Sequence, residues 1–129
     1  MKITGFMPQI ITKEPEKVIA AFEALGFERA HNKTGDTEFE FSSVVMKRQK
    51  DGSDDVFRIE IISAPTNDLP RDLTSIRINV DDLDAAYELL KSKGFTEPPG
   101  FGKNSTPSSR YIYMASPSGA LFDICQHLK

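Results

Sequence analysis

The stretch Ser75-Ile-Arg-Ile-Asn-Val-Asp-Asp-Leu-Asp-Ala-Ala-Tyr-Glu-Leu-Leu-Lys-Ser-Lys-Gly-Phe95 contains one complete strand–helix–strand unit. Apolar and polar residues alternate over 75–80, which predicts a strand with one buried face. Asp81 and Asp82 suit the N-terminus of a helix, and the apolar residues that follow recur at helical spacing. Gly94 predicts the end of that helix, because glycine adopts the backbone conformation that closes a helix.

The same order of elements occurs once before in the chain. Residues 3–11 predict a strand, and residues 14–25 predict an amphipathic helix that ends at Gly26. Gly94 follows Gly26 by 94 − 26 = 68 residues, and the same offset places Ser75 opposite Met7. A single internal duplication predicts two like modules packed together, because a solenoid needs about three repeats or more.

The composition excludes several classes of protein and partner. The chain has 129 residues, of which 27% are charged, and its net charge is −3. An acidic balance argues against nucleic acid as the main partner, and no apolar run approaches the ~20 residues of a membrane span. No apolar segment follows Lys2, so we expect no signal peptide. The single cysteine, Cys125, cannot form an internal disulfide, and we expect a cytoplasmic protein.

The rest of the chain predicts three further strands in each module. A Pro-, Gly- and Ser-rich segment over 99–109 predicts a mobile loop, with a turn expected near 32–36. The expected strands cover residues 27–30, 37–47 and 56–63 in the first module, and 95–98, 110–115 and 120–127 in the second.

The sequence resembles the vicinal oxygen chelate superfamily, which includes glyoxalase I, bleomycin-resistance proteins and extradiol dioxygenases. Three stretches carry the resemblance: Ala21-Phe-Glu-Ala-Leu-Gly-Phe27, Val80-Asp-Asp-Leu-Asp-Ala-Ala86 with Gly94-Phe95, and Ser116-Pro-Ser-Gly-Ala-Leu-Phe-Asp-Ile124. The resemblance implies an α+β fold of two βαβββ modules that form a cupped mixed sheet with the helices outside. It also implies a homodimer. We expect one domain over 1–129, with module one at 1–63, a linker at 64–72 and module two at 73–129.

Metal-using relatives place their ligands at four positions of the cup. The resemblance implies that these positions fall at Met7, Glu60, Ser75 and Asp123, where the family would have histidine at Met7 or Ser75 and glutamate at the other two. A thioether and a hydroxyl are poor replacements for imidazole. Glu60 and Asp123 with water could hold Mg²⁺ or Ca²⁺ only loosely. We therefore expect no tight metal site and no cofactor.

Strand alternation predicts which side chains line the cup. The inward-facing set includes two arginines that could bind a carboxylate or phosphate, and two carboxylates that could instead neutralise those arginines. Phe101 could close over a ligand as part of a lid, or belong to a disordered connection. The predicted ligand-binding residues are Arg58, Glu60, Ser75, Arg77, Asn79, Phe101 and Asp123.

Three functions remain open from the residues. The first is a metal-independent protein that binds a small, anionic or aromatic molecule, of the sequestering or sensing type. The second is a metal-dependent glyoxalase-like lyase, isomerase or dioxygenase that uses Glu60 or Asp123 as the base. The third is an interaction module with a filled cup.

Overall fold

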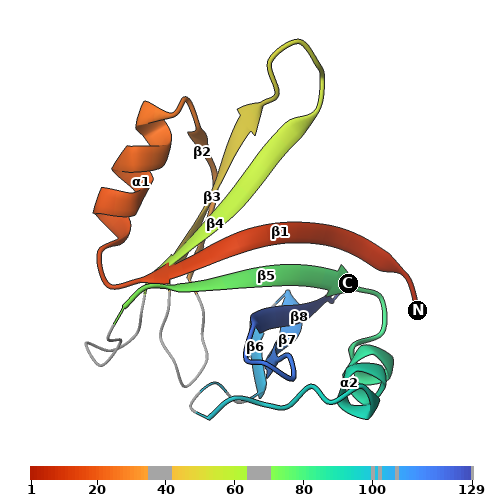
Figure 1. The fold of residues 1–129 in the computed structure, drawn as a ribbon. Coiled ribbons are helices and arrows are strands. Elements are labelled where there is room, and N and C mark those ends of the chain that lie inside the picture. The colour runs from red at the N-terminus through yellow and green to blue at the C-terminus, as the bar shows by residue number, and fades with distance from the viewer. Residues whose placement is uncertain (35–41, 64–70, 100, 102, 107, 129) are drawn as a thin grey trace. The chain divides into compact units, whose positions relative to one another are not determined.

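A computed structural model describes residues 1–34, 42–63, 71–99, 101, 103–106 and 108–128 (Figure 1). These residues form two compact units. One unit holds Met1–Met7 together with the chain from Ser75 onward, and the other holds the chain from Pro8 to Thr74. The predicted linker at 64–72 lies mostly outside the described residues, since only 71 and 72 of it are described.

The unit from Pro8 to Thr74 has the predicted order of strand, helix and three strands. Its elements are the part of β1 (Ile3–Thr12) from Pro8 onward, α1 (Pro15–Ala24), β2 (Glu28–Thr34), β3 (Ser42–Gln49) and β4 (Val56–Ser63). The strand order is β2-β3-β4-β1, with β1 parallel to β4 and the other pairs antiparallel. Helix α1 lies along one face of these strands (Figure 1), where Ile19 packs with Met46, Ile59 and Ile61 in the core.

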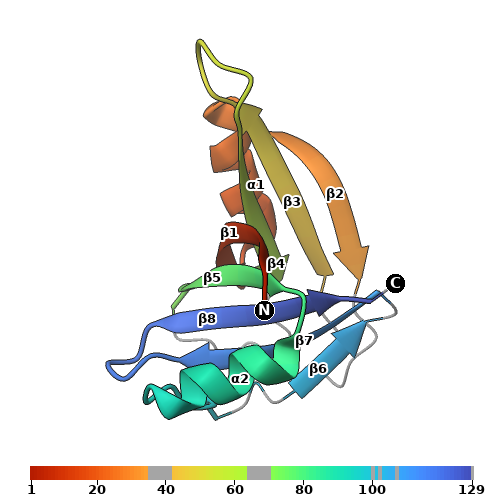
Figure 2. The same ribbon diagram turned by 90° about the vertical axis from the view of Figure 1, so that its right-hand side faces the viewer.

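The unit from Ser75 onward repeats this plan. Its elements are β5 (Leu73–Val80), α2 (Leu83–Ser92), β6 (Lys103–Thr106), β7 (Ser109–Ala115) and β8 (Leu121–His127), with strand order β5-β8-β7-β6. Helix α2 lies beside these strands (Figure 2) and buries its apolar stripe against them. The buried core of this unit consists of Val80, Leu83, Ala86, Ile112, Met114 and Ile124.

The segment after α2 differs from the prediction. The strand expected at 95–98 is reduced to one bridge between Thr96 and Ala115, and the loop expected at 99–109 contains β6. The polar composition of Lys103–Thr106 indicated a loop, but these residues pair antiparallel with β7. The unpaired backbone groups at the edge of β7 need hydrogen-bond partners whatever the side chains are, so pairing prevails over composition.

Strand β2 is also longer than predicted. It runs through Thr34, across the position where a turn was expected, and pairs with β3 through an irregularity between Arg29 and His31. Strand β3 covers Ser42–Gln49, whereas the predicted strand began at residue 37; residues 35–41 lie outside the described part. A bulge lets a polar strand follow a twisted neighbour, and sequence periodicity does not record it.

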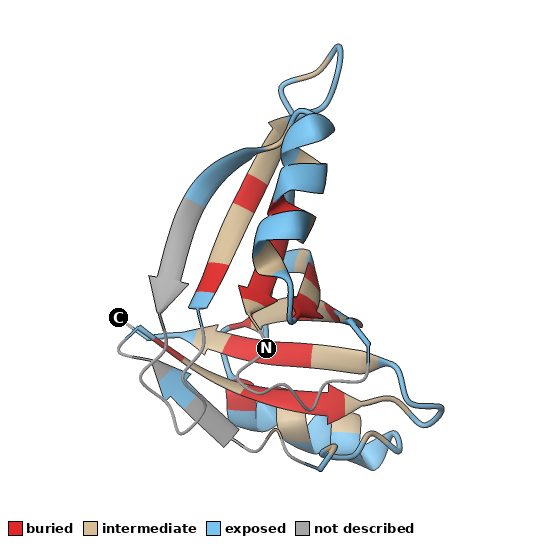
Figure 3. Ribbon diagram, turned by 90° about the vertical axis from the view of Figure 1, so that its left-hand side faces the viewer, coloured by how far each residue is buried: buried red, intermediate tan, exposed pale blue. Residues whose placement is uncertain are grey.

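Burial follows the strands in both units (Figure 3). Buried residues occur on β3, β5, β7 and β8 and on the C-terminal parts of β1 and β4, whereas the outer face of α1 is exposed. No helix in the described part of the chain is long and apolar enough to cross a membrane.

Candidate functional site

Strand β5 presents two different faces. Ile78 and Val80 pack in the core beside α2, so alternation places Ser75, Arg77 and Asn79 on the opposite face of the strand. Ser75 and Arg77 are nevertheless buried, with exposed fractions of 1% and 6%. A hydroxyl and a guanidinium are costly to remove from water unless they are hydrogen-bonded, so this face is a specialised polar environment.

A row of side chains crosses the sheet on this polar face. Arg77 of β5 lies opposite Asp123 of β8, and Asp123 lies opposite Tyr113 of β7. The ring of Phe101 lies against Tyr113, with the ring centroids 4.8 Å apart and the planes at 47°. Tyr111 meets Tyr113 edge to face at 6.1 Å. The face therefore combines a cation, a carboxylate and an aromatic wall.

Two neutral side chains orient the Arg77 guanidinium. Its Nε donates to Oδ1 of Asn79 at 3.0 Å, and its Nη2 donates to Sγ of Cys125 at 3.2 Å. The absence of a side chain at Gly5 makes room for Asn79, because a Cβ there would lie only 2.5 Å from its Nδ2 atom. Gly5 and Asn79 thus help to fix the direction in which the guanidinium points.

Ser75 stands out on this face because its hydroxyl is buried. Among the described residues, its Oγ has no hydrogen-bond partner. A buried hydroxyl without a partner costs roughly 1–3 kcal/mol. Such a group is a ready donor or acceptor for a bound molecule or a water.

A second polar cluster surrounds Glu60 in the other unit. Oε1 of Glu60 accepts a hydrogen bond from Nε2 of Gln9 at 2.6 Å, and Oε2 accepts one from Oγ of Ser43 at 2.9 Å. All three side chains are buried, and they come from three neighbouring strands. The carboxyl group is therefore held in one orientation, on the face of β4 opposite the core residues Ile59 and Ile61.

The predicted site residues fall into three groups. The polar face of β5, β8 and β7 carries Ser75, Arg77, Asn79 and Asp123, and Phe101 packs onto its Tyr113. Glu60 belongs to the other cluster. Arg58 is exposed near the start of β4, and Met7 is half-buried.

Sequence reasoning missed two members of these clusters. Ser43 was not singled out, although Val44 and Met46, which follow it in β3, pack with the core, so alternation places Ser43 on the opposite face of the strand. Tyr113 was not among the predicted ligand-binding residues. Its face follows from its pairing with Asp123, and only the three-dimensional register reveals that pairing.

The residues at the four family-equivalent positions do not fit a transition-metal site. Met7 offers a thioether and Ser75 a hydroxyl where imidazole is preferred, which leaves Glu60 and Asp123 as the ligands of suitable chemistry. Within the described part of the chain, no three His, Cys, Asp or Glu side chains lie close enough together to hold a metal ion. We derive no chemical step through a metal.

Comparison with solved structures gives likenesses over nearly the whole chain. A methylmalonyl-CoA epimerase variant from Streptomyces coelicolor, in complex with 2-nitronate-propionyl-CoA, has a TM-score of 0.70 at 15% identity, covering 99% of this chain and 100% of that chain. The methylmalonyl-CoA epimerase from Mycobacterium tuberculosis has a TM-score of 0.69 at 17% identity, covering 98% and 90% respectively.

A third solved structure has a lower TM-score. A glyoxalase/bleomycin resistance protein/dioxygenase superfamily member from Vibrio splendidus has a TM-score of 0.58 at 17% identity, covering 97% of this chain and 99% of that chain. No protein-family model matches the sequence, and no curated protein matches it. At these identities the likeness concerns the fold, which hosts several functions.

Proposed function

Because this chain has the glyoxalase/bleomycin resistance fold, we propose that it binds a small anionic molecule with an aromatic or apolar body, without a metal. The observation that carries the proposal is the buried Arg77 guanidinium on the polar face of β5, β8 and β7. A buried arginine presents a planar fork that matches carboxylate and phosphate oxygens.

The aromatic residues of the same face support the proposal that the ligand has an aromatic or apolar body. Phe101 and Tyr113 form a tilted pair, and Tyr111 extends it along β7. Aromatic side chains give a ligand a large apolar surface with few rotatable bonds. A ligand that placed its anion at Arg77 and Ser75 could lay its ring against Tyr113, which lies one strand beyond Asp123.

The test uses benzoate and phenyl phosphate as probes, with benzamide as the uncharged match. We expect both anions to raise the melting temperature and to shift the backbone amide resonances of Ser75, Arg77 and Asn79. Benzamide should bind at least about tenfold more weakly, because it lacks the charge that the guanidinium recognises. Equal binding of benzoate and benzamide, or shifts confined to other strands, would contradict the proposal.

Two substitutions separate recognition from general stability. Arg77→Gln removes the guanidinium, and Arg110→Gln is the matched control, since Arg110 contacts Gln126 on the opposite face of β7. Only the first should abolish binding of the anions. If Arg77→Gln does not fold, Phe101→Ala still tests the site, because Phe101 is half-buried and its removal should weaken phenyl phosphate more than inorganic phosphate.

A second candidate is an isomerase or lyase of the type represented by the epimerase neighbours. The buried Glu60 favours it, because a carboxyl group fixed by Gln9 and Ser43 is positioned to act on a ligand. Glu60, or alternatively Asp123, would remove a proton from a carbon next to a carbonyl. The electron pair of the broken C–H bond would form an enolate with that carbonyl group, and the proton would then return to the same carbon. A dioxygenase activity is the least supported form of this candidate, since the donor set does not suit a redox metal.

Proton exchange distinguishes the enzyme from the binding protein. The wild-type protein would be incubated with methylmalonyl-CoA in D₂O, and deuterium at the α-carbon followed by mass spectrometry. Exchange that disappears in Glu60→Gln or in Asp123→Asn would favour the enzyme and identify its base. Absence of exchange, together with Arg77-dependent binding of the anions, would leave the binding protein as the function.

The homodimer and the cytoplasmic location stay predictions. Light scattering of the purified protein would measure the first directly. Ile3 and Phe6 of β1 have exposed fractions of 58% and 68%, so an assembly that covers this strand would bury apolar surface.

A further inference from the structure

A pocket of about 370 Å³ lies on the opposite side of the sheet from the polar face. Met114 of β7 forms its base, and Met114 belongs to the core beside α2. The neighbouring Tyr113 points to the polar face, so the two sites lie on different sides of β7. The volume falls within the range of pockets that hold small ligands. The pocket is lined by Tyr87, Lys91, Gly94, Phe95, Thr96, Glu97 and Met114.

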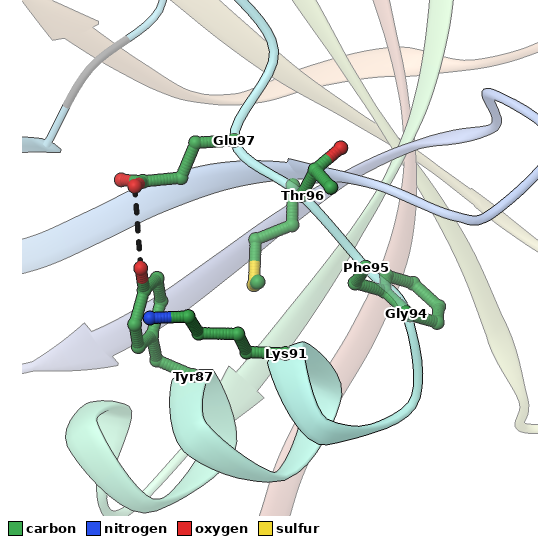
Figure 4. A pocket seen from close by; sticks show the side chains of 7 residues that line it. Tyr87, Lys91, Gly94, Phe95, Thr96 and Glu97 are labelled. Atoms are coloured by element: carbon green, nitrogen blue, oxygen red, sulfur yellow. Dashed lines mark hydrogen bonds between the residues drawn. The ribbon is translucent and has the colours of Figure 1, made fainter.

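Both walls of this pocket are held in place. The hydroxyl of Tyr87 donates to Oε2 of Glu97 at 3.2 Å, which ties α2 to the segment after it (Figure 4). Thr96 bridges to β7: its N–H donates to the carbonyl of Ala115 at 3.0 Å, and its carbonyl accepts from the N–H of Ala115 at 2.7 Å. A pocket whose walls are already fixed loses little conformational entropy when a ligand enters.

Lys91 provides the positive charge of the pocket. Its Nζ lies 5.6 Å from the centroid of the Tyr87 ring. In the described part of the chain, no carboxylate lies within ion-pair distance of this ammonium. Figure 4 shows Lys91 extending alongside Tyr87, toward the side of the pocket where Glu97 lies. Its donors are therefore available to an anion.

The C-terminus of α2 does not compete for this ammonium. The N–H of Phe95 donates to the carbonyl of Leu90 at 3.1 Å, and the N–H of Gly94 donates to that of Lys91 at 3.1 Å. The carbonyls of Leu90 and Lys91 near the end of the helix are thus already satisfied. Glu97 accepts from Tyr87, which directs this carboxylate toward the wall.

We propose that this pocket is a second binding site, for a small amphipathic organic anion. The apolar body would lie on Phe95 and Met114, beside the ring of Tyr87, and the anionic group would meet the ammonium of Lys91. This proposal is independent of the function of the polar face, because the two sites share no residue.

The test is an NMR titration of the full chain with 3-phenylpropionate, and with 3-phenylpropionamide as the uncharged match. We expect saturable shifts of the backbone N–H resonances of Phe95, Thr96 and Glu97. The affinity for 3-phenylpropionamide should be lower than that for 3-phenylpropionate by about fivefold or less, as for a partly exposed charge contact. Lys91→Gln should lower the affinity for 3-phenylpropionate to the affinity for 3-phenylpropionamide. Lys93→Gln is the matched control, because Lys93 carries the same charge one residue past α2 and does not line the pocket.

Both substitutions lie on exposed side chains, so neither should prevent folding. Unchanged binding by Lys91→Gln would overturn the proposal, as would an equal loss in Lys93→Gln. Shifts restricted to Arg77 and Asn79 would also overturn it, since the anion would then occupy the polar face alone.

Discussion

Gly26 and Gly94 have the same backbone conformation, with φ at +93° in both. In each helix the glycine N–H donates to the carbonyl three residues before it, and the N–H of the next phenylalanine donates to the carbonyl five residues before it, at 3.0–3.1 Å. This is the Schellman arrangement, and it requires a positive φ at the glycine. The duplication predicted from the sequence is thus repeated in the backbone hydrogen bonds that end both helices.

Alanine at either glycine should destabilise the protein. An L-residue at positive φ costs about 1–2 kcal/mol. At Gly26 the new Cβ would also lie 2.8 Å from Nε of Arg48, which donates to the carbonyl of Leu25 at 3.0 Å; at Gly94 it would lie 3.3 Å from Pro117. We expect Gly26→Ala to lower the free energy of unfolding more than Gly94→Ala, as measured by urea titration.

Gly52→Ala is the control for these two substitutions. Gly52 also has a positive φ, at +76°, but nothing lies within 4 Å of the position of its Cβ. Its substitution should carry the conformational cost alone. A loss at Gly52 as large as that at Gly26 would show that the contact with Arg48 contributes nothing.

The two helices begin differently, which leads to a second prediction. Oδ1 of Asp82 accepts from the N–H of Ala85 at 3.0 Å, whereas Glu14 at the start of α1 makes no side-chain cap. Asp82→Ala should lower the free energy of unfolding by about 1 kcal/mol. Asp82→Asn should lower it much less, because asparagine also caps helices. Glu14→Ala should change the stability far less. Equal losses at both positions in urea titrations would refute this difference.

Local signals predicted the helices and the core strands well. The change from a period of two to a helical period at Asp82, and the glycines at both helix ends, are properties of short stretches, and the observed elements begin and end close to them. The core face of β4 also follows the period of two, because Ile59 and Ile61 pack with Ile19 of α1.

Elements that depend on long-range pairing were predicted poorly. Strand β6 owes its existence to the edge of β7, not to its own residues. Arg48 lies in a polar stretch whose composition gives no sign of a cap, yet it caps α1 through the carbonyl of Leu25. Ser43 reaches Glu60 only because β3 and β4 pair in one register. Each of these contacts joins residues that sequence spacing does not relate.

The Glu60 cluster gives a third prediction. Ser43→Ala removes the donor to Oε2 of a buried carboxyl group, so the free energy of unfolding should fall by about 1–3 kcal/mol. Ser42→Ala is the matched control, because Ser42 is exposed and bonds only at the surface, to Ser63. The loss should shrink in a Glu60→Gln background, since the two residues interact directly. If the losses in the free energy of unfolding from Ser43→Ala and Glu60→Gln simply add in the double variant, Ser43 does not stabilise the protein through Glu60.

Glu14 and Lys17 give a prediction about pH. The hydrogen bond from Lys17, at 2.9 Å, together with the charge of Lys17, lowers the pKa of Glu14 below its ordinary value of 4.5. The same hydrogen bond, together with the charge of Glu14, raises the pKa of Lys17 above 10.5. The lowered pKa of Glu14 stabilises the fold above pH 4.5, and this stabilisation is lost as the pH falls through the lowered value. The contribution of Lys17 is complete below pH 10.5 and is lost as the pH rises through its raised value.

Substitution of Lys17 should reveal this pairing directly. In Lys17→Met, the pKa of the Glu14 carboxyl, followed by ¹³C NMR, should rise toward its ordinary value. Lys13→Met should raise it less, because Lys13 acts on Glu14 only through its charge. Concentrated salt should reduce the effect of Lys13, since the pair is exposed to solvent. A larger change in Lys13→Met would contradict the assignment.

The last prediction concerns metals. We expect that Zn²⁺, Ni²⁺, Mn²⁺ and Mg²⁺ do not raise the melting temperature of the chelator-treated protein, because Met7 and Ser75 stand where imidazole would be needed. A metal that bound only the folded state, at 100 times its dissociation constant, would add about 2.7 kcal/mol, which a thermal shift detects easily. A shift with any one of these ions that disappeared in Glu60→Ala would identify this carboxylate as a ligand. It would also make the isomerase or lyase the stronger candidate.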